Sequence, residues 1–296
     1  MFLGIEIGGT KLQLGLGDAD GTIASRWRGD VDMARGSAGI HEQILREIPK
    51  LIANAELRAI GVGFGGPTDD ATQTVIVSHQ VHGWDGFPLA SWLNEHFGVP
   101  VSICNDADVA GLAEATYGAG KGLSPIFYIT VGTGVGGGLI IDGEIYRGVG
   151  RGAAEIGHLR IGHPTKPNEI QPLENYSSGG GIEAAFGNTL TAKAIAVAAA
   201  NADAAAMAIF DVALQSLAEG ICDVIALLCP KRIIIGGGVS LLGEERFFAP
   251  LRHLVAARVF APFAGLTDIV PAALGEDVVI HGALALARKQ WLSAKS

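Results

Sequence analysis

The chain has 296 residues, which is about two domains by the usual rule of roughly 150 residues each and is enough to bury two cores. Its formal net charge is −9 and no segment gathers Lys and Arg, so we expect no nucleic-acid partner. The mean hydropathy is +0.36, but the apolar stretches are short and interrupted, so we expect no membrane span and no membrane partner. The chain opens on a strand pattern without a basic n-region, and its three cysteines suit a reducing compartment, so we expect a cytoplasmic protein.

The first predicted element is a strand over residues 2–7 that runs into the turn Gly8-Gly9-Thr10-Lys11. A second strand over residues 12–16 ends at an Asp-Gly turn, residues 18–21, and a third strand follows. Backbone N–H groups in a turn of Gly, Gly and Thr are not shielded by side chains, so a phosphate oxygen can approach them and the Thr hydroxyl. Glycine is also the default turn residue, so hairpin geometry explains one such turn equally well.

Helices and strands alternate through the rest of the first half, in the order helix 37–55, strand 59–64, helix 88–97 and strand 99–104. The strand 59–64 ends at Gly65-Gly66-Pro67, a stop that suits a loop at the edge of a binding site. The strand 99–104 delivers Asn105-Asp106 to the start of the next helix. An Asp at that position has two interpretations, a helix N-cap or a site residue.

The second half repeats the opening pattern. A strand over residues 127–131 runs into Gly132-Thr133-Gly134, and a further strand ends at Asp142-Gly143. The spacing from Thr10 to Thr133 is 123 residues, and the two Asp-Gly turns are offset by nearly the same number. The duplication favours phosphate binding over hairpin geometry alone.

Four further segments follow in order: a loop over 157–181, a helical run over 191–226 interrupted near Asn201, a strand over 231–235, and a terminal helix from His281. The loop is long enough that a purely connecting role is not expected. The strand enters Gly236-Gly237-Gly238, which is either an ordinary tight turn or one that admits a phosphate or a flat ligand to the main chain. We expect the terminal helix to lie back on the first half.

In this order the motifs resemble the ROK family of sugar kinases, within the actin-like and hexokinase-like class of ATPases, over nearly the whole chain. Gly8-Gly9-Thr10-Lys11 looks like the family's first phosphate motif, Gly132-Thr133-Gly134 like the second, and Gly236-Gly237-Gly238 like the adenosine motif. Between them stand four further matching strings, Gly63 to Asp69, Val81 to Trp84, Asn105-Asp106-Ala107 and Glu155-Ile156-Gly157-His158.

The resemblance implies a duplicated α/β fold of the actin-like, ribonuclease H-like type, with two lobes of mixed sheets around a central cleft. We expect residues 1–108 to form the small N-terminal lobe, with a terminal helix at about 282–296 packed back on it. We expect residues 109–281 to form the larger C-terminal lobe. A homodimer is common among relatives, and we expect one here.

The resemblance further implies transfer of a phosphoryl group from ATP, with Mg²⁺, to a hexose hydroxyl. Such a reaction asks the protein for alignment, charge neutralisation and one proton acceptor, and Asp106 matches the family's catalytic aspartate. Sugar hydroxyls each need a polar partner. By resemblance these partners are Gly66, Gln80, Asn105, Glu155, His158 and Glu174.

Three departures from the family pattern stand out. Glu6 stands where the family usually has an Asp near the metal. We expect Glu6 to bind Mg²⁺, directly or through water, with its oxygens displaced relative to those of an Asp. The usual zinc cysteines are absent between His158 and Glu174, so we expect no zinc site. Gln80, flanked by His79 and His82, stands where an Asn commonly touches the sugar, which leaves the sugar unidentified.

Alternatives to a glucokinase-like or fructokinase-like enzyme remain open. A ROK-like protein that binds sugar or nucleotide without turnover is compatible with Glu6 and with the altered loop. A sugar-sensing repressor would need a DNA-reading helix-turn-helix ahead of the first strand, and that strand is expected to begin within two residues of the initial Met. An actin-like or chaperone-type ATPase would share the phosphate turns, but we would not expect it to carry Asn105-Asp106 together with Glu155 and His158.

Overall fold

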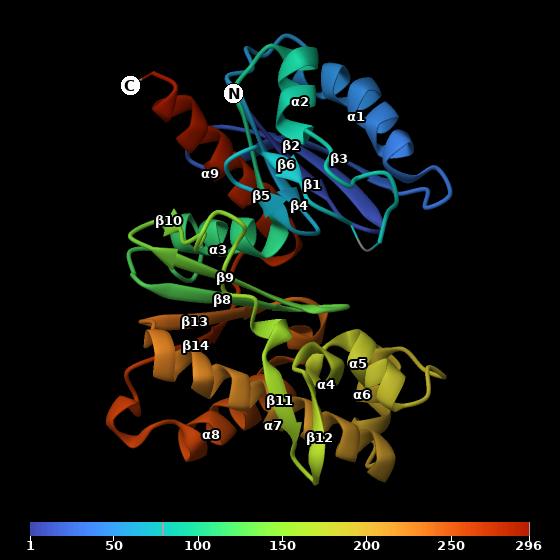
Figure 1. The fold of residues 1–296 in the computed structure, drawn as a ribbon, viewed down its shortest axis with the longest axis vertical. Helices are drawn as coiled ribbons and strands as arrows, with labels where there is room; N and C mark the ends of the chain where they lie inside the picture. Colours follow the sequence, from blue (N-terminus) through green and yellow to red (C-terminus); the bar gives the residue numbers. More distant parts are fainter. Residues whose placement is uncertain (79, 296) are drawn as a thin grey trace. The chain divides into compact units, whose positions relative to one another are not determined.

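The computed structural model describes residues 1–78 and 80–295. Its contacts divide the chain into two compact units. The structure has two five-stranded mixed sheets (Figure 1): all strands of the first belong to unit 1, and all strands of the second except its edge strand belong to unit 2. Unit 1 comprises Met1–Gly122, Gly143–Ala153 and Leu274–Ser296, and unit 2 comprises Leu123–Asp142 and Ala154–Ala273. The lobe boundary expected after residue 108 stays a prediction; the compact units keep the following helix, α3 (Asp106–Thr116), within unit 1.

Unit 1 is an α/β layer structure built on one sheet. Its elements in chain order are β1 (Phe2–Ile7), β2 (Lys11–Gly17), β3 (Ile23–Asp30), α1 (Gly36–Ile52), β4 (Ala59–Phe64), β5 (Thr68–Asp69), β6 (Thr74–Val75), α2 (Leu89–Phe97), β7 (Val101–Asn105), α3, β10 (Glu144–Ile145) and α9 (Val278–Ser293). The sheet order is β3-β2-β1-β4-β7. Strand β1 pairs antiparallel with β2 and parallel with β4, and β4 pairs parallel with β7.

The two faces of this sheet differ in their side chains. One face carries large aliphatic residues, and these form a core with the apolar stripes of α1 and α2, where Ile40, Ile44 and Leu93 are buried. The opposite face carries glycines, which allow α9 to approach the backbone. A Cβ placed on Gly61 would lie 2.0 Å from the carbonyl oxygen of Ala283, so only glycine fits there. The terminal helix therefore lies against β1 and β4 (Figure 1).

Unit 2 repeats the strand pattern and adds helices. Its elements are β8 (Ile126–Val131), β9 (Val135–Ile141), the turn η1 (Ile156–His158), β11 (Arg160–His163), β12 (Lys166–Pro172), α4 (Glu174–Ser177), α5 (Gly179–Ala185), α6 (Ala192–Ala200), α7 (Ala204–Leu228), β13 (Arg232–Gly236), η2 (Gly238–Leu242), η3 (Glu244–Phe248), α8 (Ala249–Arg258), η4 (Ala261–Phe263) and β14 (Asp268–Pro271). The sheet order is β10-β9-β8-β13-β14, with the unit boundary in the turn between β9 and β10. This order matches that of the first sheet strand for strand.

Helix α7 crosses the core of unit 2. Leu217 and Ile221 pack there with buried residues of β8 and β13, including Ile129 and Ile235. By length and composition alone α7 is also long and apolar enough to cross a membrane, a test that the core helix of a soluble protein passes as well. Three acidic residues interrupt its 25 residues, and the expectation of no membrane span stays a prediction.

The expected loop over 157–181 is largely structured, which corrects the sequence-based interpretation. Strands β11 and β12 form an antiparallel hairpin, and α4 and α5 follow it. The segment is rich in Pro, Asn, Ser and Gly, which is why its sequence indicates a loop. In the structure Pro164 lies at the hairpin turn, Pro167 is the second residue of β12 and Pro172 is its last.

Candidate active site

Three parallel strands of unit 1 end side by side. Ile7 of β1 pairs with Phe64 of β4, and Phe64 pairs with Asn105 of β7. The residues that come directly after these strands are Gly8, Gly65 and Asp106. The carboxyl ends of parallel strands are where open α/β sheets hold their ligands. The structure therefore brings the first glycine turn, the Gly65-Gly66 loop and Asp106 to one edge of one sheet.

Asn105, rather than Asp106, is the N-cap of α3. Its Oδ1 accepts the backbone N–H of Ala107 at 2.9 Å, and its Nδ2 donates to the carbonyl oxygen of Gly66 at 3.3 Å. Asp106 Oδ1 also accepts from Ala107 N at 2.8 Å, while its Oδ2 lies 3.5 Å from the place a Cβ on Gly65 would occupy. Capping is thus largely performed by Asn105, and the half-buried Asp106 carboxylate reaches the Gly65 loop.

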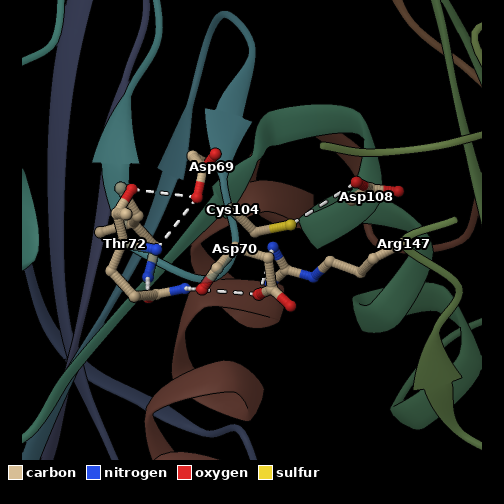
Figure 2. Close-up of polar contacts among 8 residues, drawn as sticks. Asp69, Asp70, Thr72, Cys104, Asp108 and Arg147 are labelled. Atoms are coloured by element: carbon tan, nitrogen blue, oxygen red, sulfur yellow. Dashed lines mark hydrogen bonds and ion pairs between the residues drawn. The ribbon is translucent and has the colours of Figure 1, made fainter. Parts of the chain in front are cut away.

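The loop after Gly66 is fixed by polar contacts (Figure 2). Asp69 accepts from both the backbone N–H and the hydroxyl of Thr72 at 3.0 Å, and these bonds lower the pKa of the Asp69 carboxyl. Asp70 forms an ion pair of 3.0 Å with Arg147, whose side chain is only 15% exposed. The segment 143–153 is therefore tied to the loop that carries the predicted sugar contact at Gly66.

Cys104 precedes this site on β7 and is buried (Figure 2). Its Sγ donates to Asp108 Oδ2 at 3.5 Å. Burial, followed by the nearby Asp108 charge, raises the pKa of the Cys104 thiol well above its ordinary value. A protonated, buried thiol is not a nucleophile, so Cys104 is a core residue, as its sequence context indicates.

The first glycine turn carries a buried charged cluster. Its closing backbone bond runs from Gly8 N to Lys11 O at 3.0 Å. Glu6 is 7% exposed; its Oε1 lies 3.0 Å from Lys11 Nζ, and its Oε2 accepts from Gln13 Nε2 at 2.6 Å. Both oxygens of the predicted metal carboxylate are thus engaged by side chains of β2. No sequence pattern points to Gln13, because only the strand register places it opposite Glu6.

Gln80 lies against the first glycine turn. A Cβ placed on Gly9 would be 1.5 Å from Gln80 Oε1, so the side chain occupies the space that the missing Cβ leaves. The His82 ring lies over Gly36 at the start of α1, and His79 lies outside the described residues. The sugar contact assigned to Gln80 stays a prediction. In the structure the Gln80 amide lies against the predicted phosphate turn.

The two predicted nucleotide turns of unit 2 are neighbours. Gly236 of β13 pairs with Thr130 of β8, so both parallel strands end at the same level. Gly237 has a φ of +87°, and a Cβ there would lie 2.6 Å from the backbone of Val131. Only glycine allows this approach. It brings Gly236-Gly237-Gly238 beside Gly132-Thr133-Gly134.

The second glycine turn is docked on the start of α5 and borders an open groove. Gly179 N donates to Gly132 O at 2.7 Å, and Gly180 N donates to Thr133 O at 3.2 Å. The groove has a volume of about 420 Å³ and is lined by Thr133, Gln171, Glu174, Asn175, Ser178, Gly180, Gly181 and Ala184. Glu174 Oε2 lies 3.0 Å from the place of a Cβ on Gly134, so this carboxylate faces the turn.

Glu155, His158 and Glu174 form an electrostatic group in unit 2. The one-turn helix η1 follows Glu155 and ends at His158. Burial raises the pKa of the Glu155 carboxyl; the nearby His158 lowers this pKa and Glu174 raises it. Two of the predicted sugar-binding residues therefore lie close enough to Glu155, a third, to influence its charge.

The region that usually carries zinc is a hairpin in this chain. The His163 ring packs edge-on against Tyr176 with centroids 5.4 Å apart, and Thr165 N donates to His163 Nδ1. Across residues 1–78 and 80–295, no three side chains of His, Cys, Asp or Glu gather in a group that could hold a metal ion. The absence of zinc stays a prediction.

Comparison with known proteins places the chain in a family. The family model described as ROK family matches residues 2–290. The chain is 31% identical over 315 residues to a glucokinase of Halalkalibacterium halodurans, covering 98% of this chain and 95% of that protein. It is 30% identical over 298 residues to an N-acetylmannosamine kinase of Escherichia coli, covering 98% and 99%.

Solved structures agree with this assignment. The structure of a ROK family glucokinase from Streptomyces griseus in complex with glucose and AMPPNP superposes with a TM-score of 0.79 at 29% identity, covering 97% of this chain and 99% of that chain. The expected α/β fold of the duplicated actin-like ATPase type is thereby confirmed. The chain belongs to the ROK family.

Proposed function

We propose that the protein transfers the γ-phosphoryl group of ATP to a hydroxyl of a hexose, with Asp106 as the general base. The observation that carries the proposal is the alignment of Gly8, Gly65 and Asp106 at the ends of three parallel strands. A phosphate turn, a loop for the acceptor and a carboxylate meet at one sheet edge. The glucokinase that binds glucose and AMPPNP supports the choice of a hexose and a nucleotide.

The reaction needs one proton acceptor in unit 1. The oxygen of the sugar hydroxyl forms a bond to the γ-phosphorus, the bond from that phosphorus to the bridging oxygen breaks, and ADP leaves. The proton of the hydroxyl passes to the carboxylate of Asp106. Asn105 serves this step indirectly, because its bonds to Ala107 and Gly66 fix the start of α3 where Asp106 stands.

Each unit has glycine turns that we assign to phosphate contacts. In unit 1 the backbone of Gly8-Gly9-Thr10 and the ammonium of Lys11 offer donors and positive charge. In unit 2 Thr133 of the second turn lines the open groove, and Gly236-Gly237-Gly238, of which only Gly238 is exposed, is assigned to the adenosine. Neutralising the triphosphate is the main electrostatic task of a phosphoryl-transfer site.

Each unit contains residues that the family resemblance assigns to sugar binding. Glu155, His158 and Glu174 form one polar group, and Asn105 with the backbone of Gly66 forms the other. A ring with several hydroxyls requires such a set, because each hydroxyl left without a partner costs affinity. The similarity to a glucokinase and to an N-acetylmannosamine kinase leads us to test 2-substituted hexoses as well as glucose and fructose.

Glu6 fits a role beside a Mg²⁺ ion that arrives with ATP. Its buried carboxylate already stabilises a cation, the Lys11 ammonium at 3.0 Å, and oxygen ligands suit Mg²⁺. Bound Mg²⁺ would supply charge neutralisation at the phosphates. Glu6 would hold it, directly or through water.

The test is ADP release measured in a coupled assay with ATP, Mg²⁺ and a panel of glucose, fructose, mannose, allose and the N-acetylhexosamines. We expect at least one sugar to stimulate turnover strongly over the rate without sugar. The rival proposal is a protein that binds sugar or nucleotide without turnover; it would show a raised melting temperature with a sugar and no ADP release. If no sugar stimulates ADP release and no sugar raises the melting temperature, both proposals are refuted. The homodimer, the cytoplasmic location and the lack of nucleic-acid and membrane partners stay predictions.

A further inference from the structure

Gln13 is a buried polar residue with one evident task. It is 6% exposed and lies directly opposite Glu6 in the antiparallel pair of β1 and β2. Its Nε2 donates to Glu6 Oε2 at 2.6 Å, while Lys11, two residues earlier on the same face of β2, contacts the other oxygen at 3.0 Å. The two β2 side chains thus hold the two oxygens of one carboxylate.

A glutamine is a costly choice for such a position. Its neighbours on β2, Leu12 and Leu14, are fully buried and aliphatic, and an aliphatic side chain at 13 would avoid the burial of an amide. The amide is compensated by its short bond to a carboxylate, a charge-assisted bond that is stronger than a neutral one. The bond therefore explains why a glutamine stands there.

The longer arm of Glu6 explains why the carboxylate needs to be held. Compared with the Asp usual in this family, Glu has one more rotatable bond, so its oxygens are less fixed by the backbone. On the other side of Glu6 the paired residue of β4 is Gly63, which offers no polar side chain. We propose that Gln13 is a positioning residue that fixes the Glu6 carboxylate at the first glycine turn.

This inference rests on the proposed function. Lys11 pairs with Glu6 at 3.0 Å, and anionic phosphates bound at Gly8-Gly9-Thr10 would compete for the same ammonium. Gln13 is neutral and gains nothing from the phosphates, so it keeps one oxygen of Glu6 in place while Lys11 shifts. The carboxylate then keeps its direction when cations and phosphates enter the turn.

Glu6 and Gln13 are therefore a matched pair. Glu6→Asp would restore the residue usual in the family but would withdraw the carboxylate by about 1.3 Å or more, beyond reach of the Gln13 amide. We expect the single variant to be impaired in this chain. The combination of Glu6→Asp with Gln13→Met is expected to lose no more than either change alone, because each breaks the same bond.

The experiment uses Gln13→Met, which keeps the length and removes the amide. We expect the Kd for Mg·AMPPNP, measured by calorimetry, to rise roughly tenfold, and the KM for ATP to rise in parallel, with the KM for the sugar within about twofold. Gln215→Met is the matched control: Gln215 Nε2 also donates to a carboxylate, Asp211 Oδ2 at 2.7 Å, but at the surface of α7. Gln215→Met should leave the Kd for Mg·AMPPNP and the KM for ATP unchanged.

Several outcomes overturn the inference. Unchanged nucleotide affinity in Gln13→Met does so, and so does an equal loss of sugar and nucleotide affinity with a lowered melting temperature, which is the mark of a merely structural role. If Gln13→Met fails to fold, Gln13→Asn retains the amide on an arm too short to reach and must show the same selective loss. A wild-type protein that neither binds Mg·AMPPNP nor phosphorylates a sugar refutes the proposed function instead.

Discussion

The two glycine turns follow the same strand pattern but have different surroundings. The first, Gly8 to Lys11, is filled by the molecule's own side chains: Lys11 is paired with Glu6, and Gln80 occupies the space over Gly9. The second, Gly132 to Gly134, has its carbonyls fixed by α5 but borders an open groove of about 420 Å³, and a Cβ on Gly132 would meet no atom within 4 Å.

The difference shows how a duplicated fold divides its tasks. Unit 1 closes its turn with the bond from Gly8 N to Lys11 O and fills it with side chains that must move or exchange partners when a ligand enters. Unit 2 closes its turn with the bond from Gly132 N to Gly134 O and leaves Thr133 at the open groove. We infer that the chemical step depends on unit 1, which also carries binding residues, whereas unit 2 carries residues whose loss affects binding alone.

The largest effect is expected from Asp106→Asn in unit 1. The amide keeps the size of the carboxylate but removes the proton acceptor, so kcat should fall by a factor of about 10² to 10⁴ while sugar affinity stays within a few fold. Steady-state kinetics and calorimetric titration with the sugar measure the two quantities. Asp20→Asn, an exposed position in unit 1, is the control. Equal losses in binding and rate would contradict the assigned role.

The next effect concerns the stability of unit 1, which is assembled from three chain segments. Glu114 is fully buried and joins two of them, because its Oε2 accepts from Ala119 N at 2.7 Å and its Oε1 from Leu274 N at 3.0 Å. Glu114→Ala leaves buried donors without these acceptors and should lower the free energy of unfolding by about 2–4 kcal/mol. Urea unfolding measures it, with the exposed Glu95→Ala as control. A change below about 0.5 kcal/mol would show that water replaces the carboxyl at no cost.

A smaller, binding-specific effect is expected from Glu155→Gln in unit 2. The change removes the charge of a carboxyl that interacts with His158 and Glu174. Glu155 is not the proposed proton acceptor of the reaction. The KM for the sugar should rise roughly tenfold, with kcat reduced less than in Asp106→Asn. Glu245→Gln, exposed in the same unit, provides the control. A kcat loss as large as that of Asp106→Asn would contradict the inference that residues of unit 2 affect binding and not the chemical step.

The smallest effect is a pH dependence of stability that arises in unit 1. His41 is packed among Phe87, Trp92 and Trp84 at centroid distances of 4.5 to 4.8 Å, and burial lowers its pKa from 6.5 to about 4. In the unfolded chain His41 takes up a proton below about pH 6.5, whereas in the folded chain it does so only near pH 4. The folded state is therefore destabilised as the pH falls from 6.5 to 4. For a half-buried ring we expect a loss of about 1–2 kcal/mol.

His41→Phe keeps the aromatic packing and removes the titration. Urea unfolding at pH 7 and at pH 4.5 should therefore show a smaller loss of stability on acidification in the variant than in the wild type. The matched change His253→Phe on α8, outside this aromatic cluster, should leave the loss as it is. An identical pH dependence in His41→Phe and wild type would assign the acid sensitivity to other groups.

Local chemistry made much of the fold predictable. The turns at Gly8-Gly9 and Gly132 to Gly134 follow from glycine itself, and the interruption of the alanine-rich helical run near Asn201 is confirmed by the break between α6 and α7. The amphipathic spacing of Ile40, Ile44 and Ile48 gave α1, which ends at Ile52. The hairpin β11–β12 was missed because its prolines oppose a strand assignment by composition, while its hydrogen bonds do not depend on them.

The sequence by itself determined the order of motifs, the duplication and the residue types of the site, because these depend on neighbours along the chain. Only the tertiary structure decided that Asn105 contacts the carbonyl of Gly66, that Gln80 lies on Gly9, and that Gln13 holds Glu6. These contacts join residues through strand register and loop packing. A one-residue shift in register would turn Gln13 to the other face of the sheet, and no local pattern fixes that choice.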